Sequence, residues 1–254
     1  MKKTLKEIAR LFLRCLAKLL TAIEVQKNPL RARESSRSLH HELWVRAVRE
    51  SADFVENYLT EALVFEEIEQ IWDFAIQKIK EDYSPGGGDG KGGICLEFGV
   101  FKGHSINYFS SRLNQLEFHG FDSFEGLRED WLGHMLQKGT FDLKGKIPSV
   151  NKNVIIYKGF FEDTLQPFIE NNKSTISFIH MDSDTYDSAK FVLEKLLPYL
   201  EKQTLVLFDD YHSYPNWING EHKALSECKE EFGFSVNYIG FSKEQALIEI
   251  VKEF

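Results

Sequence analysis

The fold is decided by the segment Leu96-Glu-Phe-Gly-Val-Phe-Lys-Gly-His-Ser105. It begins inside a short apolar run, and its two glycines lie four residues apart ahead of an expected helix. Glycine lets the backbone approach a ligand closely, and the N-terminus of the next helix favours polar or anionic groups. The dinucleotide pattern G-x-G-x-x-G is absent, because Phe101 stands where the second glycine should be. A nicotinamide cofactor is therefore disfavoured.

Five short apolar runs alternate with helical stretches from this segment onward. They cover residues 94–98, 117–121, 153–157, 176–181 and 204–208. Repeated βα steps of this kind predict a parallel sheet with right-handed crossovers. A helix near 222–231 then leads to two more runs, at 234–239 and 246–251, whose short connection requires an antiparallel hairpin. The sequence thus predicts an α/β fold with a seven-stranded, Rossmann-like sheet.

Acidic residues stand at the ends of the first two predicted strands. Glu97 lies in the first, and Asp122 follows the second, at the position where an acid accepts both hydroxyls of a cofactor ribose. Taken singly, Glu97 is more simply explained as a helix cap and Asp122 as a turn former. Together with the predicted sheet, the pair indicates a cofactor site.

Aspartates also follow the fourth and fifth predicted strands, as Asp182-Ser-Asp184 and Asp209-Asp210. Ligands of such sheets bind beyond the carboxyl ends of the strands, and these two strands are neighbours in the predicted topology, so the four carboxylates should converge. Crowded acids raise one another's pKa unless a cation neutralises them. Oxygen ligands suit a hard cation such as Mg²⁺, which would also acidify a bound substrate hydroxyl.

Two other interpretations of these aspartates are open. Loop aspartates commonly cap helices or face solvent. Asp182-Ser-Asp184 also matches the Asp-x-Asp string of nucleotide-sugar glycosyltransferases. The glycosyltransferase interpretation is weaker, because it leaves Glu97, the glycine turn and Asp209-Asp210 without a shared explanation.

Charge is unevenly distributed over the 254 residues, whose net charge is -8. Residues 1–50 carry 12 Lys and Arg against 5 Asp and Glu, whereas the remaining 204 residues carry 19 against 34. An acidic body lacks the basic face that nucleic-acid binding requires, so no nucleic-acid partner is expected. Cys15, Cys95 and Cys228 lack metal-type spacing and indicate free thiols in a reducing compartment, which predicts a cytoplasmic protein.

The basic beginning predicts an amphipathic helix over residues 5–23. Its apolar positions recur every three or four residues: Leu5, Ile8, Phe12, Leu16, Leu19 and Ile23. Such a helix packs on its own domain or on a second subunit in a homo-oligomer, or else adsorbs peripherally to an anionic membrane. Residues 40–80 are again helical in pattern, and a glycine-rich run at 84–93 ends them. We therefore expect a helical extension over 1–93 and a second domain over 94–254.

The motifs resemble those of the macrocin O-methyltransferase family, within the class I S-adenosylmethionine-dependent methyltransferases. Besides residues 96–105, the resemblance rests on Gly120-Phe-Asp-Ser-Phe-Glu-Gly-Leu127, Lys158-Gly-Phe-Phe-Glu-Asp-Thr-Leu165, residues 180–188 and Phe208-Asp-Asp-Tyr211. It spans roughly 94–251. Arg128 departs from the family, which usually has proline there.

The resemblance implies an enzyme that methylates a hydroxyl of a sugar or glycosylated small molecule, using S-adenosylmethionine and Mg²⁺. It implies Asp182, Asp209 and Asp210 as metal ligands, and Asp184 as the general base. The cofactor contacts that it implies are Glu97, Phe98, Gly99, Gly103, Ser105, Asp122, Ser123, Phe124 and Asp182. Because Asp182 and Asp184 lie two residues apart, they could exchange roles. The opposing hypothesis is a non-catalytic module that keeps the cofactor pocket and works through its basic helix.

Overall fold

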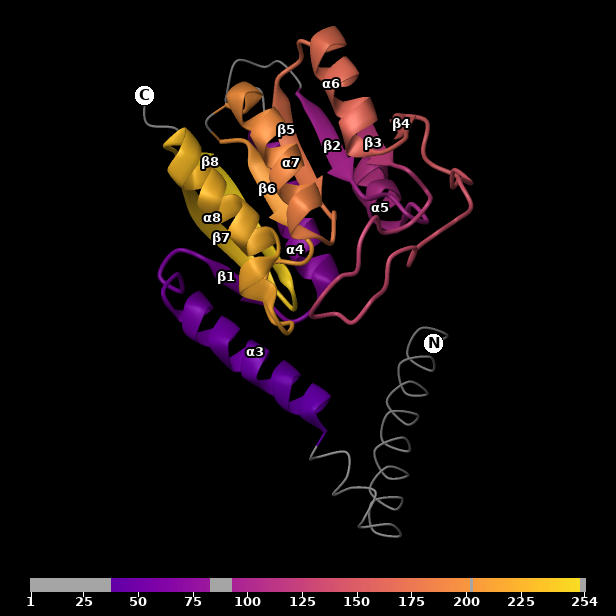
Figure 1. Cartoon of the computed structure of the whole chain (residues 1–254). Coiled ribbons are helices and arrows are strands. Elements are labelled where there is room, and N and C mark those ends of the chain that lie inside the picture. Colours follow the sequence, from indigo (N-terminus) through magenta and orange to yellow (C-terminus); the bar gives the residue numbers. More distant parts are fainter. Residues whose placement is uncertain (1–37, 83–92, 202, 252–254) are drawn as a thin grey trace, which may run out of the picture. The chain divides into compact units, whose positions relative to one another are not determined.

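The computed structural model describes residues 38–82, 93–201 and 203–251 (Figure 1). Close contacts divide the chain into two units, Met1–Arg46 and Ala47–Phe254. Residues 47–82 therefore group with the sheet, whereas the sequence predicted that this domain begins at residue 94. The expected amphipathic helix over 5–23 lies outside the described residues.

One mixed sheet of eight strands forms the centre of the larger unit. Its strands are β1 (Leu63–Phe65), β2 (Ile94–Phe98), β3 (Phe118–Asp122), β4 (Val154–Lys158), β5 (Ile176–Met181), β6 (Leu205–Phe208), β7 (Ser235–Ser242) and β8 (Gln245–Val251). They lie in the order β1-β7-β8-β6-β5-β2-β3-β4. The five strands β2, β3, β4, β5 and β6 are parallel to one another, and β8 is antiparallel to both β6 and β7. The five predicted parallel strands and the closing hairpin are confirmed.

The predicted number of seven strands is wrong, because β1 extends the sheet beyond β7. The sequence predicted continuous helical structure over residues 40–80, but this stretch forms α3 (Leu39–Glu56), β1 and α4 (Ile68–Asp82). Leu63 pairs with Gly240 and Phe65 with Ser242 in parallel register. A three-residue strand is too short to show a period of two, and its pairing partner is distant in sequence, so local pattern could not reveal it.

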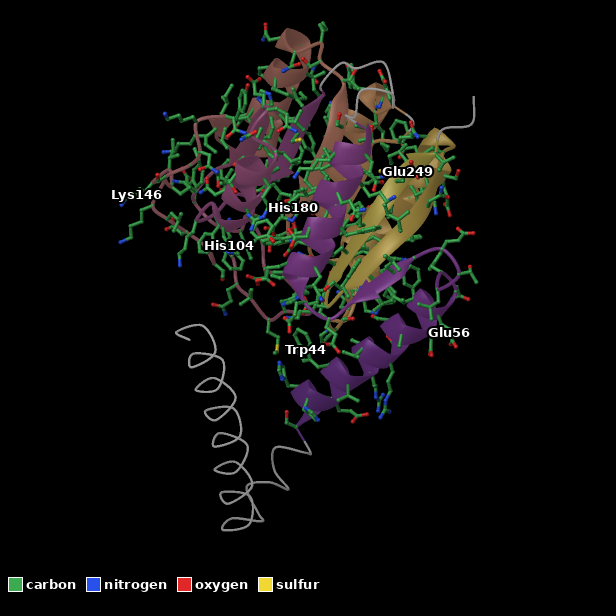
Figure 2. The ribbon with its side chains drawn as sticks, turned by 180° about the vertical axis from the view of Figure 1, so that it is seen from behind. Trp44, Glu56, His104, Lys146, His180 and Glu249 are labelled. Atoms are coloured by element: carbon green, nitrogen blue, oxygen red, sulfur yellow. The ribbon has the colours of Figure 1, made fainter. Side chains whose placement is uncertain are left out.

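Helices cover both faces of the sheet. On one face lie α6 (Phe161–Asn171), α7 (Tyr186–Leu196) and α8 (Glu221–Phe232), packed side by side (Figure 1). On the other lie α4 and α5 (His104–Arg112), and Figure 2 shows α4 crossing that face. Short 3₁₀ turns, η1 (Leu197–Tyr199) and η2 (Trp217–Asn219), complete the described elements. Two hydrophobic cores result, one on each side.

The central strands are buried on both faces. Every residue of β2 and β6 is buried, whereas the edge strand β4 has only half-buried and exposed positions. Strands of a parallel sheet that helices cover on both faces have no solvent-facing side, so nearly all of their residues are apolar. This explains why the central strands stand in the sequence as continuous apolar runs. Because β2 to β6 are parallel, the loops that follow them leave the sheet at a single edge.

Two further features concern the cysteines and a possible membrane span. Cys95 and Cys228 are buried free thiols. Among the helices within the described ranges, none has the length and apolar composition that a bilayer crossing requires. Cys15 lies outside these ranges.

Candidate functional site

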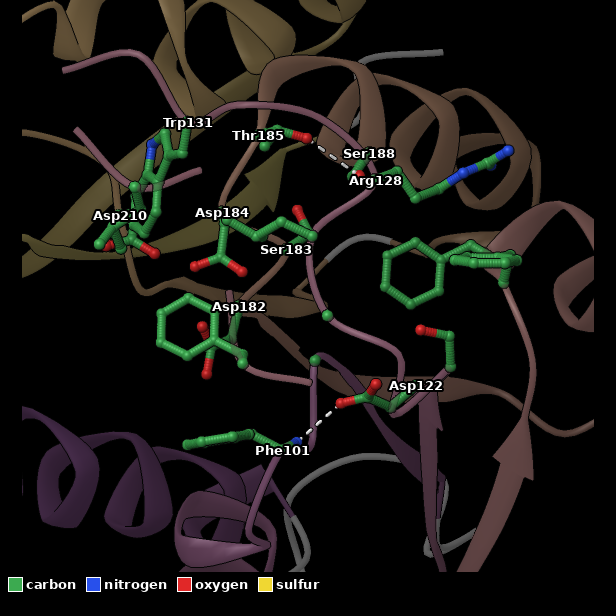
Figure 3. Close-up of a pocket in the computed structure, with 18 of the residues that line it drawn as sticks. Phe101, Asp122, Arg128, Trp131, Asp182, Ser183, Asp184, Thr185, Ser188 and Asp210 are labelled. Carbon is green, nitrogen blue, oxygen red and sulfur yellow. Dashed lines mark hydrogen bonds between the residues drawn. The ribbon is translucent and has the colours of Figure 1, made fainter. Parts of the chain in front are cut away.

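A cavity of about 420 Å³ opens at the carboxyl edge of the parallel strands (Figure 3). Each of the five loops that follow β2 to β6 contributes to its wall, through Gly99, Ser123, Gly159, Asp182 and Asp209 respectively. The volume lies in the range of cavities that hold small organic ligands. The parallel topology therefore brings the predicted cofactor motif and the predicted aspartate cluster to one cavity.

The glycine turn after β2 passes directly against the end of β5. Gly99 has a φ of 95°, and a Cβ atom there would lie 1.8 Å from the backbone oxygen of Asp182. Only glycine accommodates both this left-handed conformation and this approach. Gly103, with a φ of 77°, then caps the N-terminus of α5.

Asp122 organises the same turn through its carboxylate. Its Oδ2 accepts hydrogen bonds from the backbone N–H groups of Val100 (2.9 Å) and Phe101 (2.7 Å), and its Oδ1 accepts one from Phe124 N–H (2.6 Å). A carboxylate has about four lone-pair sites, so these three bonds leave room for a further donor such as a ribose hydroxyl. Asp122 and Ser123 line the cavity.

Other predicted cofactor contacts lie behind the cavity wall. Glu97, Phe98, Gly103, Ser105 and Phe124 are absent from its lining, whereas Gly99 and Asp182 belong to it. Glu97 and Phe98 belong to β2, and Gly103 and Ser105 belong to the N-terminus of α5.

Glu97 belongs to a buried network that reaches the aspartates. It is 1% exposed, and its carboxylate accepts a hydrogen bond from Ser105 Oγ (3.0 Å) and pairs with His180 Nδ1 (3.1 Å). His180 Nε2 lies 3.4 Å from Asp209 Oδ1. Burial by itself would lower the pKa of His180, but the neighbouring carboxylates of Asp209 and Glu97 outweigh burial and raise that pKa well above the usual value. His180 is thus a hydrogen-bonded residue of the sheet interior.

Three of the four predicted aspartates group tightly. One carboxylate oxygen from each of Asp182, Asp184 and Asp210 lies within 4.8 Å of the others, and Figure 3 shows the three side chains around a common space. Asp209 groups instead with Asp182 and His180. Gln245 Nε2 also donates a short hydrogen bond to Asp209 Oδ1. Asp184 has a φ of 63°, in the left-handed region that few non-glycine residues adopt and in which aspartate is enriched.

Burial and mutual repulsion make this cluster electrostatically unfavourable without a cation. Burial, with Asp209 and Asp122 nearby, raises the pKa of Asp184 to about 8. Burial and neighbouring carboxylates, Asp209 first among them, raise the pKa values of Asp182 and Asp210 well above the usual range. A hard divalent cation prefers oxygen ligands at such spacing. The donor set therefore fits Mg²⁺.

Glu221 is a residue that the sequence analysis missed. It is 0% exposed, and its carboxylate accepts hydrogen bonds from both Ser183 and Asp210. As an acid in the first turn of a helix, it has the usual sequence signature of a solvent-facing residue near a helix N-terminus. No local pattern in the sequence distinguishes it from such a residue, so its burial could not be predicted.

The loop after β3 supplies much of the opposite rim. Trp131, His134 and Phe141 line the cavity, whereas Tyr214 and Trp217 are buried away from it. Arg128 also lines the cavity, with its Nη1 2.5 Å from Glu162 Oε1. Its guanidinium stacks 4.5 Å from the centre of the Phe160 ring.

Comparisons with known proteins agree with this geometry. Residues 96–211 match the model of a methyltransferase domain, which spans the glycine turn and both pairs of aspartates. The structure of CalS11, a calicheamicin methyltransferase, is similar with a TM-score of 0.55 and 20% identity, over 82% of this chain and 91% of that one. The structure of the O-methyltransferase NovP is similar with a TM-score of 0.52 and 18% identity, over 71% of this chain and 79% of that one. No curated protein sequence matches the chain.

The solved structures show that the chain shares its fold with these two methyltransferases. Together with the domain match, they support an S-adenosylmethionine-dependent O-methyltransferase. The cavity at the carboxyl edge fits such an enzyme, because the matched segment carries the loops that build it.

Proposed function

We propose that the protein transfers a methyl group from S-adenosylmethionine to a hydroxyl of a sugar or glycosylated small molecule in a Mg²⁺-dependent reaction. The observation that carries this proposal is the convergence on one cavity of the Gly99 turn, Asp122 and the Asp182, Asp184 and Asp210 cluster. The narrower likeness to the macrocin O-methyltransferase family remains a prediction from the sequence motifs.

On the cofactor side, Asp122 and Ser123 would bind the ribose, and the Gly99 turn would admit the rest of the molecule close to the backbone. Asp122 is suited to this role because backbone amides fix its carboxylate at the cavity wall. Glu97 and Ser105 would act from behind the wall, by holding His180 and the start of α5.

On the acceptor side, Asp182, Asp209 and Asp210 would hold the metal ion. When bound, S-adenosylmethionine supplies an electrophilic methyl group, and Mg²⁺ supplies positive charge that lowers the pKa of an acceptor hydroxyl. Asp184 would accept the hydroxyl proton as the oxygen attacks the methyl carbon and the bond from that carbon to sulfur breaks. Exchange of Asp182 and Asp184 is the competing assignment, since both lie in the tight group with Asp210.

A sugar acceptor is proposed from the cavity rim and from a structural neighbour. Trp131 and Phe141 offer aromatic faces, on which the apolar face of a sugar ring can stack. CalS11 is described as a TDP-rhamnose 3'-O-methyltransferase. Because this chain shares the fold of CalS11, we propose a sugar acceptor for this chain as well.

The proposal is tested by turnover. The full chain is incubated with methyl-labelled S-adenosylmethionine and a panel of glycosylated acceptors, with Mg²⁺ or with a chelator. We expect label in at least one acceptor, and only with the metal. Absence of label from every acceptor, despite cofactor binding, would favour the non-catalytic module.

Asp122→Ala should weaken S-adenosylmethionine binding by about 1 to 3 kcal/mol, because a charged acceptor of hydrogen bonds is lost. Loss of three backbone hydrogen bonds should loosen the glycine turn as well. Isothermal calorimetry measures the affinity, and Asp163→Ala is a matched control, since Asp163 is exposed on α6 and outside the cavity lining. Equal affinities for wild type and Asp122→Ala would remove Asp122 from the cofactor site.

A further inference from the structure

We propose that Glu221 is a positioning residue that holds the two aspartate-bearing loops at the separation that Mg²⁺ binding requires. The inference rests on the metal site of the proposed function. Glu221 lies buried on α8, and it would set the positions of carboxylates that follow two different strands, β5 and β6.

Each oxygen of the Glu221 carboxylate serves one loop. Oε1 accepts hydrogen bonds from Ser183 N–H (3.3 Å) and Ser183 Oγ (3.2 Å), and Oε2 accepts one from Asp210 N–H (3.3 Å). Ser183 lies between Asp182 and Asp184, as Figure 3 shows. One side chain therefore bridges the loop after β5 and the loop after β6.

The alternative explanation, a helix cap, does not fit these contacts. An acid in the first turn of a helix is stabilised by the helix's own free N–H groups and needs no burial. Glu221 is instead fully buried, and its hydrogen bonds go to Ser183 and Asp210, outside α8. Burying a carboxylate beside other carboxylates costs free energy. A role in holding the loops explains why the site tolerates this cost.

Metal geometry makes the separation of the loops important. Mg²⁺ requires near-octahedral ligands at about 2.0 to 2.1 Å, so small displacements of a carboxylate weaken binding. Groups that orient metal ligands typically contribute about 10- to 100-fold to metal affinity. Glu221 holds Asp210 through its backbone N–H, and it holds Ser183 through both its backbone N–H and its hydroxyl. These bonds fix the positions of the backbone that carries the neighbouring carboxylates.

Two substitutions separate this positioning from simple charge. Glu221→Gln keeps the length but has one acceptor oxygen, so its NH₂ group would face a backbone N–H of one loop. Glu221→Asp keeps the charge but is shorter by one carbon, so it cannot reach both loops. Glu230→Gln is the matched control, because Glu230 is exposed on the same helix.

The experiment is a Mg²⁺ titration of the full chain by isothermal calorimetry, beside an S-adenosylhomocysteine titration in chelator. We expect Glu221→Gln and Glu221→Asp to weaken Mg²⁺ binding by about 10- to 100-fold. Both variants should bind S-adenosylhomocysteine like the wild type, and Glu230→Gln should match the wild type in both titrations.

Wild-type Mg²⁺ affinity in both Glu221 variants would overturn the inference. So would loss of affinity in Glu221→Gln alone, because charge rather than reach would then be responsible. Should neither variant fold, Ser183→Ala removes the hydrogen bond from Ser183 Oγ to Glu221, one of the three that join the loops, and should weaken Mg²⁺ binding by less than the Glu221 variants. Unchanged Mg²⁺ affinity in Ser183→Ala would refute the inference. A wild type that binds no Mg²⁺ would instead refute the metal site itself, whereas the outcomes above leave that site intact.

Discussion

Asp184→Asn should lower turnover by about 10²- to 10⁴-fold, the usual contribution of a positioned general base. An amide cannot accept the proton of the acceptor hydroxyl, while its size and shape match those of the carboxylate. Because Asp184 is assigned no metal ligation, Mg²⁺ and S-adenosylhomocysteine should bind with near wild-type affinity. Single-turnover kinetics measures the chemical step, and calorimetry measures both affinities.

The matched control is Asp187→Asn, since Asp187 is an exposed acid three residues further along the same segment. It should leave turnover unchanged. The competing assignment predicts a different pair of results: Asp184→Asn loses Mg²⁺, and Asp182→Asn keeps Mg²⁺ but loses turnover. That pattern would exchange the roles of the two residues and leave the location of the site unchanged.

Asp210→Asn should lower Mg²⁺ affinity by more than the about 10- to 100-fold typical of groups that only orient ligands. The substitution removes a negative oxygen donor from a hard cation at a residue that is only 6% exposed. Turnover at low Mg²⁺ should fall accordingly and recover in part when excess Mg²⁺ is added. A Mg²⁺ titration of turnover measures both effects.

The metal-free Asp210→Asn variant offers an internal check on folding. Burial disfavours the charged form of Asp210, and the neighbouring carboxylates of Asp209 and Asp184 add to this effect. Removing that charge should therefore leave the melting temperature in chelator unchanged or higher. A clear fall in melting temperature would assign the loss of activity to folding, and full activity in chelator would overturn the metal mechanism.

Much of the sheet could be predicted from the sequence because its central strands are buried on both faces. Residues 94–98 and 176–181 form β2 and β5 with the predicted bounds, and the hairpin follows from the short connection before Gln245. Convergence of the aspartates also follows from topology, since parallel strands end at one edge. The strand β1 could not be found, because its evidence lies in pairing with β7 rather than in its own three residues.

The candidate site was less predictable where side chains act through other residues. Glu97 has the position of a cofactor contact, yet the structure buries it against Ser105 and His180. Glu221 and Gln245 reach the aspartates from α8 and β8, and no local pattern marks either residue. Motif spacing predicts which loops meet, whereas tertiary packing decides which side chains enter the cavity.

The most direct test of the central claim is diffraction from crystals grown with S-adenosylhomocysteine and Mn²⁺, whose anomalous signal locates the metal. We expect a metal peak bonded to Asp182 and Asp210, with Asp209 as the third carboxylate ligand. The nucleoside should lie between the Gly99 turn and Asp122. A metal peak away from the aspartates, or a nucleoside bound outside the cavity, would contradict the account.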